Sequence, residues 1–124
     1  MMSLLLLAGC GGADVDQEES RILVSNGLEA TYSARRAPQV GLNEFDVWLR
    51  LDGLAVDGAT LEVEPWMATH GHGVSTSPTV EEVEAGHFEL KEVLLSMPGR
   101  WEIRTEVFME GKHRAAFAPE VEVQ

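Results

Sequence analysis

The chain has 124 residues, enough for one domain with a real hydrophobic core but not for two of ordinary size. It carries 9 Lys and Arg against 21 Asp and Glu, a formal net charge of −12, and its basic residues form no cluster beyond Arg35-Arg36. This balance argues against nucleic acids and anionic lipid surfaces as partners, and the ordinary consequence of such an acidic surface is solubility.

The chain opens with a short apolar run that ends in small residues and its only cysteine, Cys10. The sequence Leu7-Ala8-Gly9-Cys10 resembles the lipobox of bacterial lipoproteins, in which a signal peptide is cut before the cysteine and the cysteine carries the lipid. This resemblance implies a signal peptide over 1–9, a lipidated Cys10 and, with Gly11 after it, sorting to the outer membrane facing the periplasm. The alternative is a free cysteine on a frayed apolar tail.

The apolar run is too short to cross a bilayer, so a transmembrane helix is not expected. It is also shorter than an ordinary secretory signal and has no positively charged start, and we therefore expect the natural start to lie upstream. Residues 10–20 continue with the cysteine and an acidic, polar stretch that has one aliphatic residue, which predicts a flexible tether. The folded domain is expected over 21–124.

Within the domain, apolar residues recur with a period of two in short runs separated by Gly, Pro, Asn and Asp. Such alternation is typical of β-strands with one buried face, and no stretch keeps helical periodicity over two turns. The first strands are expected over 28–35, 44–51 and 61–67, with turns at Asp52-Gly53 and Asp57-Gly58.

The second half of the domain continues the same pattern. Residues 74–86 begin as a polar loop and run into an acidic strand or turn around Val80 and Val83, and the next strand, over 87–97, changes phase near Lys91-Glu92. Such a change of phase predicts a β-bulge. A central strand over 101–109, a hairpin turn at 110–112 and a final apolar strand close the domain.

These strands and their turns, spaced every 8 to 12 residues over roughly 100 residues, predict an all-β fold. The expected architecture is an immunoglobulin-like antiparallel β-sandwich of about seven strands, and a small barrel is the alternative. The inward positions predict a core that contains Phe45, Val47, Leu49, Leu61, Val63, Trp101, Ile103, Val107 and Phe117.

One stretch, residues 65–73, gathers nitrogen and sulfur donors in a small space. His70 and His72 are two residues apart, so in an extended segment their imidazoles project to the same side, and Met67 precedes them. Imidazole suits copper, zinc, iron and nickel, while a thioether favours copper, particularly Cu(I). The alternative is a plain polar loop with Met67 as core filler, and the parity of the strand does direct Met67 inward.

The sequence Met67-x-x-His70-Gly71-His72-Gly73, followed by Met97-Pro98-Gly99-x-Trp101, resembles the YtkA-like domain family, which is related to FixH. The resemblance extends over about residues 28–123, and members of the family are immunoglobulin-type sandwiches of secreted or membrane-anchored bacterial proteins. Several members are linked to copper handling or to the maturation of haem-copper oxidases.

This resemblance implies copper as the bound ion and Met67, His70, His72 and Met97 as its metal ligands. It also implies a partner in the cell envelope that receives copper. The chain departs from many relatives in having Ala68 where they have proline, but it keeps the donor side chains.

Other aromatic and imidazole side chains have less specific interpretations. Trp66 could shield a bound ion or simply pack at the strand end, Trp48 is expected to be an isolated surface aromatic, and His87 and His113 are expected at the surface. Trp101 is expected in the core, and Met97 is open between core residue and ligand.

No pattern predicts an enzyme. The sequence has no Gly-x-Ser-x-Gly, no phosphate-binding glycine loop and no dinucleotide fingerprint, and its carboxylates fit solvated strand faces. Two functions remain: a lipid-anchored copper-binding protein that acts as chaperone or buffer in the cell envelope, and a metal-free sandwich that acts as an adhesion or assembly module.

Overall fold

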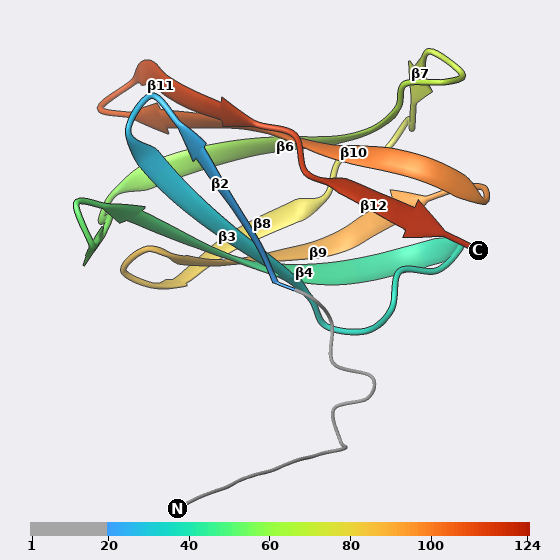
Figure 1. The fold of residues 1–124 in the computed structure, drawn as a ribbon, viewed down its shortest axis with the longest axis horizontal. Helices are drawn as coiled ribbons and strands as arrows, with labels where there is room; N and C mark the ends of the chain where they lie inside the picture. The colour runs from blue at the N-terminus through green and yellow to red at the C-terminus, as the bar shows by residue number, and fades with distance from the viewer. Residues whose placement is uncertain (1–19) are drawn as a thin grey trace, which may run out of the picture.

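In the computed structural model, which describes residues 20–124, the chain folds into two antiparallel β-sheets that pack face to face (Figure 1). Sheet 1 contains β2 (Arg21–Ser25), β3 (Leu28–Ala34), β4 (Gly41–Leu51), β5 (Leu54–Ala55), β8 (Thr79–Glu84) and β9 (His87–Leu95). Sheet 2 contains β6 (Ala59–Met67), β7 (His72–Gly73), β10 (Gly99–Met109), β11 (Lys112–Phe117) and β12 (Glu120–Val123). The predicted all-β sandwich is confirmed.

The expected signal peptide, Cys10 and nearly all of the expected tether lie outside the described residues. Strand β2 begins at Arg21. Between Ser20 and the C-terminus, no helix has the length and apolar character needed to cross a bilayer.

The strand order is that of an immunoglobulin domain. Sheet 1 runs β2-β3-β4-β9-β8 and sheet 2 runs β11-β10-β6-β7. The neighbours β3-β4-β9-β8 and β11-β10-β6 therefore correspond to the A-B-E-D and G-F-C sheets of a seven-stranded immunoglobulin fold. The expectation of about seven strands holds for this framework.

The structure nevertheless has eleven strands over residues 20–124. Strand β2 is added beyond β3, β12 continues along β10 where β11 ends, and β5 and β7 have two residues each. Strands of two residues carry no alternation that a sequence pattern could reveal, which is why β5 and β7 were not predicted.

Three tight hairpin turns use the same backbone conformation. Asn26-Gly27, Asp52-Gly53 and Glu110-Gly111 each place two successive residues at positive φ, between 53° and 83°. Two positive φ values are the mark of a type I′ turn, whose twist matches that of paired strands. The turns predicted at Asp52-Gly53 and at 110–112 are confirmed. The turn at Asn26-Gly27, between β2 and β3, was not predicted.

The phase change in the strand of residues 87–97 is a β-bulge, as predicted. Glu92 has φ 58°, and the register between β4 and β9 shifts between Asn43 and Phe45. The extra residue lets Leu90 before it and Val93 after it both face the core, where each is fully buried.

The core lies between the two sheets and contains eight of the nine predicted residues as buried side chains. The exception is Val63, which is only half-buried. It lies on β6 beside a groove that Pro78 and Val80 also line, at the lateral opening between the sheets. Val63 therefore packs against the core, as its strand parity predicts, but stays half-buried because parity gives the face of a residue and not its distance from the open side of the sandwich.

Candidate metal centre

The four predicted ligands lie at one end of the sandwich. Met67 is the last residue of β6, His70 lies in the turn after it, and His72 begins β7. Met97 lies in the connection between β9 and β10, which reaches the same end because antiparallel neighbours β6 and β10 end and begin together. Figure 1 shows β7 and the connection into β10 on the same side of the molecule.

The turn between β6 and β7 is held by the carbonyl of Met67. This oxygen accepts hydrogen bonds from the backbone N–H of His70, at 3.1 Å, and from that of Gly71, at 2.9 Å. Gly71 has φ 66°, a conformation that glycine adopts without a steric penalty. The chain therefore reverses tightly and returns as β7 beside the end of β6.

The register of this hairpin sets which side chains share a face. Met67 and His72 are directly opposed partners in the β6–β7 ladder. Opposed residues of an antiparallel pair project to the same side of the sheet. Met67 is 1% exposed and faces the core, so the half-buried imidazole of His72 lies on the same side, at the rim of the core.

The two imidazoles lie close together. The ring centroids of His70 and His72 are 5.7 Å apart with an interplanar angle of 64°. The Nδ1 atom of His72 lies 3.0 Å from the carbonyl oxygen of Gly73, and because a carbonyl only accepts, Nδ1 carries the proton and donates. The Nε2 atom of His72 is then the nitrogen with a free lone pair, an arrangement that commonly orients a metal-binding imidazole.

Trp101 contacts Met97, and Gly99 contacts Met67, at this end of the sandwich. The Nε1–H of the buried Trp101 donates a hydrogen bond of 3.0 Å to the carbonyl of Met97, and the ring of His72 lies 6.1 Å from the indole. A β-carbon placed on Gly99 would lie 2.7 Å from Cε of Met67, so the Met67 side chain rests against the backbone of this segment. Met97 itself is half-buried.

This donor set differs from an ordinary zinc or iron site. Among residues 20–124, no three side chains of the types His, Cys, Asp and Glu are grouped so that they could hold a metal ion. Two imidazoles and two thioethers at one rim are instead the combination that a soft ion such as Cu(I) accepts. The donor types present are those that Cu(I) accepts, and the side chain of Met67 is 1% exposed and faces the core.

The expectation that Trp66 could shield an ion is not supported by its orientation. Successive residues of a strand project to opposite faces, so Trp66 points away from the face that Met67 occupies. Its ring instead lies 4.6 Å below the guanidinium of Arg104 and beside Gly73, whose missing side chain leaves it room. Packing, the other interpretation of Trp66, agrees with this geometry, and the aromatic ring near His72 is that of Trp101.

Trp48 is not the isolated surface aromatic that was expected, and His87, expected at the surface, is only partly exposed. They are directly opposed on β4 and β9, both are half-buried, and their rings stack with centroids 4.8 Å apart. Nε2 of His87 lies 2.8 Å from Asp46. Only the pairing of β4 with β9 creates this contact, so no local sequence pattern could have indicated it. His113 is exposed, as expected, and contacts Glu106.

Asp46 and Glu89 share the guanidinium of Arg35. Its Nε and Nη2 atoms donate to Asp46 at 2.9 Å and 3.0 Å, and Nη2 also donates to Glu89 at 2.6 Å. The hydrogen bonds from Arg35 hold the pKa of Asp46 and that of Glu89 below their ordinary values. These contacts tie the end of β3 to β4 and β9.

Comparison with known proteins adds a family and a fold. The sequence model of the family described as YtkA-like matches residues 23–106. The crystal structure of a DUF4426 family protein from Pseudomonas aeruginosa PAO1 superposes with a TM-score of 0.59 at 15% sequence identity, covering 82% of this chain and 94% of that one. At this identity the superposition demonstrates a shared fold only. No curated protein sequence matches the chain.

Proposed function

This chain belongs to the YtkA-like family, and on that premise we propose that it is a lipid-anchored protein of the cell envelope that binds one copper ion through His70, His72, Met67 and Met97. It would act as a copper chaperone or buffer. The observation that carries the proposal is the direct pairing of Met67 with His72, which puts a thioether and an imidazole on one face of the sheet.

The chemistry of the donors supports Cu(I) as the cargo. Thioethers stay uncharged and the proposed set contains no thiolate, so the ligands compensate none of the charge of the ion. A monovalent ion tolerates this better than a divalent one, and soft sulfur donors also favour Cu(I). His70 is exposed, so a protein that exchanges copper with this one has direct access to this ligand.

We propose no catalytic role. The function of such a site is to hold and release an ion, which requires an accessible rim rather than a nucleophile and a base. The lipidated Cys10 would keep the domain at the outer membrane facing the periplasm, and a copper-receiving envelope protein would be its partner. The resemblance of Leu7-Ala8-Gly9-Cys10 to a lipobox supports this location.

Titration of the purified protein with Cu(I) against a chromophoric chelator tests the proposal. We expect one equivalent to bind tightly, and we expect the double substitution His70→Ala and His72→Ala to abolish tight binding while the circular dichroism spectrum stays unchanged. His113→Ala, which removes an exposed imidazole on β11, is the matched control and should bind as the parent does.

The second candidate function, a metal-free adhesion or assembly module, makes the opposite prediction. In that case the parent would show no tight Cu(I) binding, or the double variant would bind as well as the parent. Either result would exclude copper handling as the function of this protein and favour the adhesion or assembly module.

A further inference from the structure

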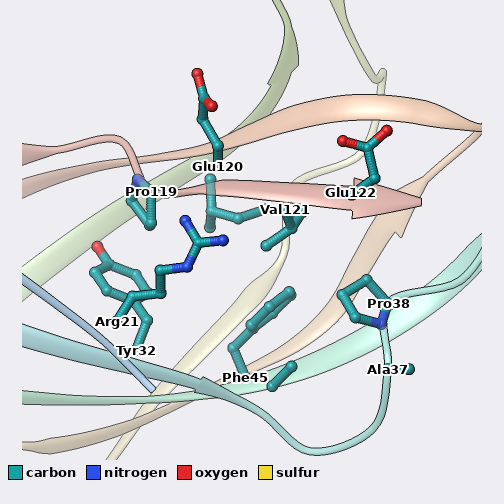
Figure 2. A pocket seen from close by; sticks show the side chains of 11 residues that line it. Arg21, Tyr32, Ala37, Pro38, Phe45, Pro119, Glu120, Val121 and Glu122 are labelled. Carbon is teal, nitrogen blue, oxygen red and sulfur yellow. The ribbon is translucent and has the colours of Figure 1, made fainter. Parts of the chain in front are cut away.

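A separate hollow opens between the two sheets on the side where β2 begins and β12 passes along β10 (Figure 2). Its volume is about 300 Å³. Its floor is formed by Tyr32, Phe45 and Ile103, which are 3%, 2% and 0% exposed, and its accessible apolar sides by the half-buried Ala34, Pro38 and Val121. None of the four proposed copper ligands lines it, so it is a different site from the metal centre.

The charged residues at the mouth of this hollow are not equivalent. Figure 2 shows the carboxylates of Glu120 and Glu122 on the outer side of β12, pointing away from Phe45. Both lie near the guanidinium of Arg100, at 3.9 Å and 3.5 Å. The two acidic side chains that line the mouth therefore point to solvent and pair with Arg100.

Arg21 behaves differently. Its guanidinium lies over the hollow between Tyr32 and Val121 (Figure 2). Within residues 20–124 it forms no ion pair with a carboxylate. The mouth thus presents one positive charge above walls that are mostly apolar.

We propose that this hollow binds a small amphipathic monoanion, with its apolar chain along Ala34, Pro38 and Val121 and its carboxylate on Arg21. An apolar cavity with a single convergent charged group is the usual form of a small-molecule site, and about 300 Å³ is at the lower end of the range for such pockets. The ligand class is therefore a short to medium-chain fatty acid. A guanidinium recognises a carboxylate through paired, charge-assisted hydrogen bonds.

The chain that leads into Arg21 does not suit the hollow. Residues 11–20 contain four acidic residues and one aliphatic residue, Val15, so they offer little apolar surface for these walls. A free amphipathic acid matches both the walls and the cation at the mouth.

The test is a titration of the ¹⁵N-labelled full chain with decanoate, followed by amide chemical shifts. We expect saturable shifts at Tyr32, Phe45 and Val121, and weaker binding of decyltrimethylammonium. Arg21→Gln should weaken decanoate binding about tenfold, the effect of losing one charge-assisted contact, and change decanol binding less than about twofold. Arg36→Gln, at an exposed arginine that does not line this hollow, is the matched control.

A filling substitution provides a second readout. Ala34 lines the hollow from the end of β3, and Ala34→Phe should abolish the binding of both decanoate and decanol. Absence of saturable shifts at about 1 mM decanoate would overturn the proposal. So would equal affinity of the parent and Arg21→Gln for decanoate, or nuclear Overhauser contacts from Leu4 to Leu7 onto Phe45, which would identify the N-terminal run of the chain as the occupant.

Discussion

The hydroxyl group of Tyr32 on β3 donates a hydrogen bond of 2.7 Å to Oγ1 of Thr105 on β10, and this contact joins the two sheets through the core. Both side chains are buried, and the hydroxyl of Thr105 in turn donates a hydrogen bond of 3.1 Å to the carbonyl of Ile103. Burial raises the pKa of Tyr32 far above its ordinary value, because water no longer stabilises a phenolate there.

Removal of either partner of this hydrogen bond should have unequal consequences. Tyr32→Phe should lower the free energy of unfolding by about 1 kcal/mol, the usual net value of one hydrogen bond. Thr105→Val should cost about 1–3 kcal/mol, because it leaves the buried hydroxyl of Tyr32 without an acceptor. Urea denaturation of both variants and the double variant measures the coupling, and additive losses would contradict a direct interaction.

Trp101 is the largest fully buried side chain of the core. Trp101→Ala should lower the free energy of unfolding by roughly 3–5 kcal/mol, as the loss of a large core aromatic does, and a loss below about 1 kcal/mol would mean that the packing around it differs from that described here. Trp101→Phe separates the two roles of the side chain. It keeps a ring but removes the N–H that holds the carbonyl of Met97, so we expect weaker Cu(I) binding with a smaller loss of stability.

Gly99 has φ 132° and leaves the space that Cε of Met67 occupies. Gly99→Ala should therefore displace the thioether and add backbone strain, with a loss of about 1–3 kcal/mol in the free energy of unfolding. Gly111→Ala is the matched control, because Gly111 has φ 77° but nothing lies within 4 Å of an added β-carbon. If Gly99→Ala lowered Cu(I) affinity no more than Gly111→Ala, a role for the position of Met67 in the site would be excluded.

The ion pair between Arg35 and Asp46 should make stability depend on pH. Because the pKa of Asp46 is lower in the folded state than in the unfolded state, the pair contributes stability above the unfolded pKa and loses it as pH falls through the folded one. Arg35→Gln should cost on the order of 1 kcal/mol at neutral pH, since Arg35 is 39% exposed and solvent screens the pair.

The difference between Arg35→Gln and the parent should then shrink below about pH 4, where carboxylates of the unfolded chain protonate. Thermal unfolding at neutral and acid pH measures it, with Arg36→Gln at the exposed neighbouring arginine as control. A difference that stays constant down to low pH would show that Arg35 acts through packing rather than through the carboxylate.

Lipidation of Cys10 predicts a specific product. Protein purified from its native membrane should have the mass of residues 10–124 plus acyl groups, and Cys10→Ser should move the protein to the soluble fraction. A soluble parent that still carries Met1, made in a cell that processes lipoproteins, would contradict the lipobox interpretation.

The sequence by itself determined the class of fold and most of the core. Alternation with a period of two is a local property, since each residue of a strand projects opposite to its neighbours, and it correctly placed Phe45, Trp101 and Met67 inward. Turn chemistry is local as well, and Asp52-Gly53 has the backbone conformation that its residue types favour. The motif of residues 67–73 and 97–101 was likewise sufficient to indicate the family that the comparison confirms.

Only the tertiary structure decided which residues meet. The pairing of Met67 with His72, the stacking of Trp48 on His87 and the hydrogen bond from Tyr32 to Thr105 depend on strand register and sheet packing. These contacts join residues between 5 and 73 positions apart in the chain, and the two longer ones leave no periodic trace in either segment. The incomplete burial of Val63 and the hollow beside Arg21 have the same origin, because they arise where the edges of two sheets fail to close rather than from any property of one strand.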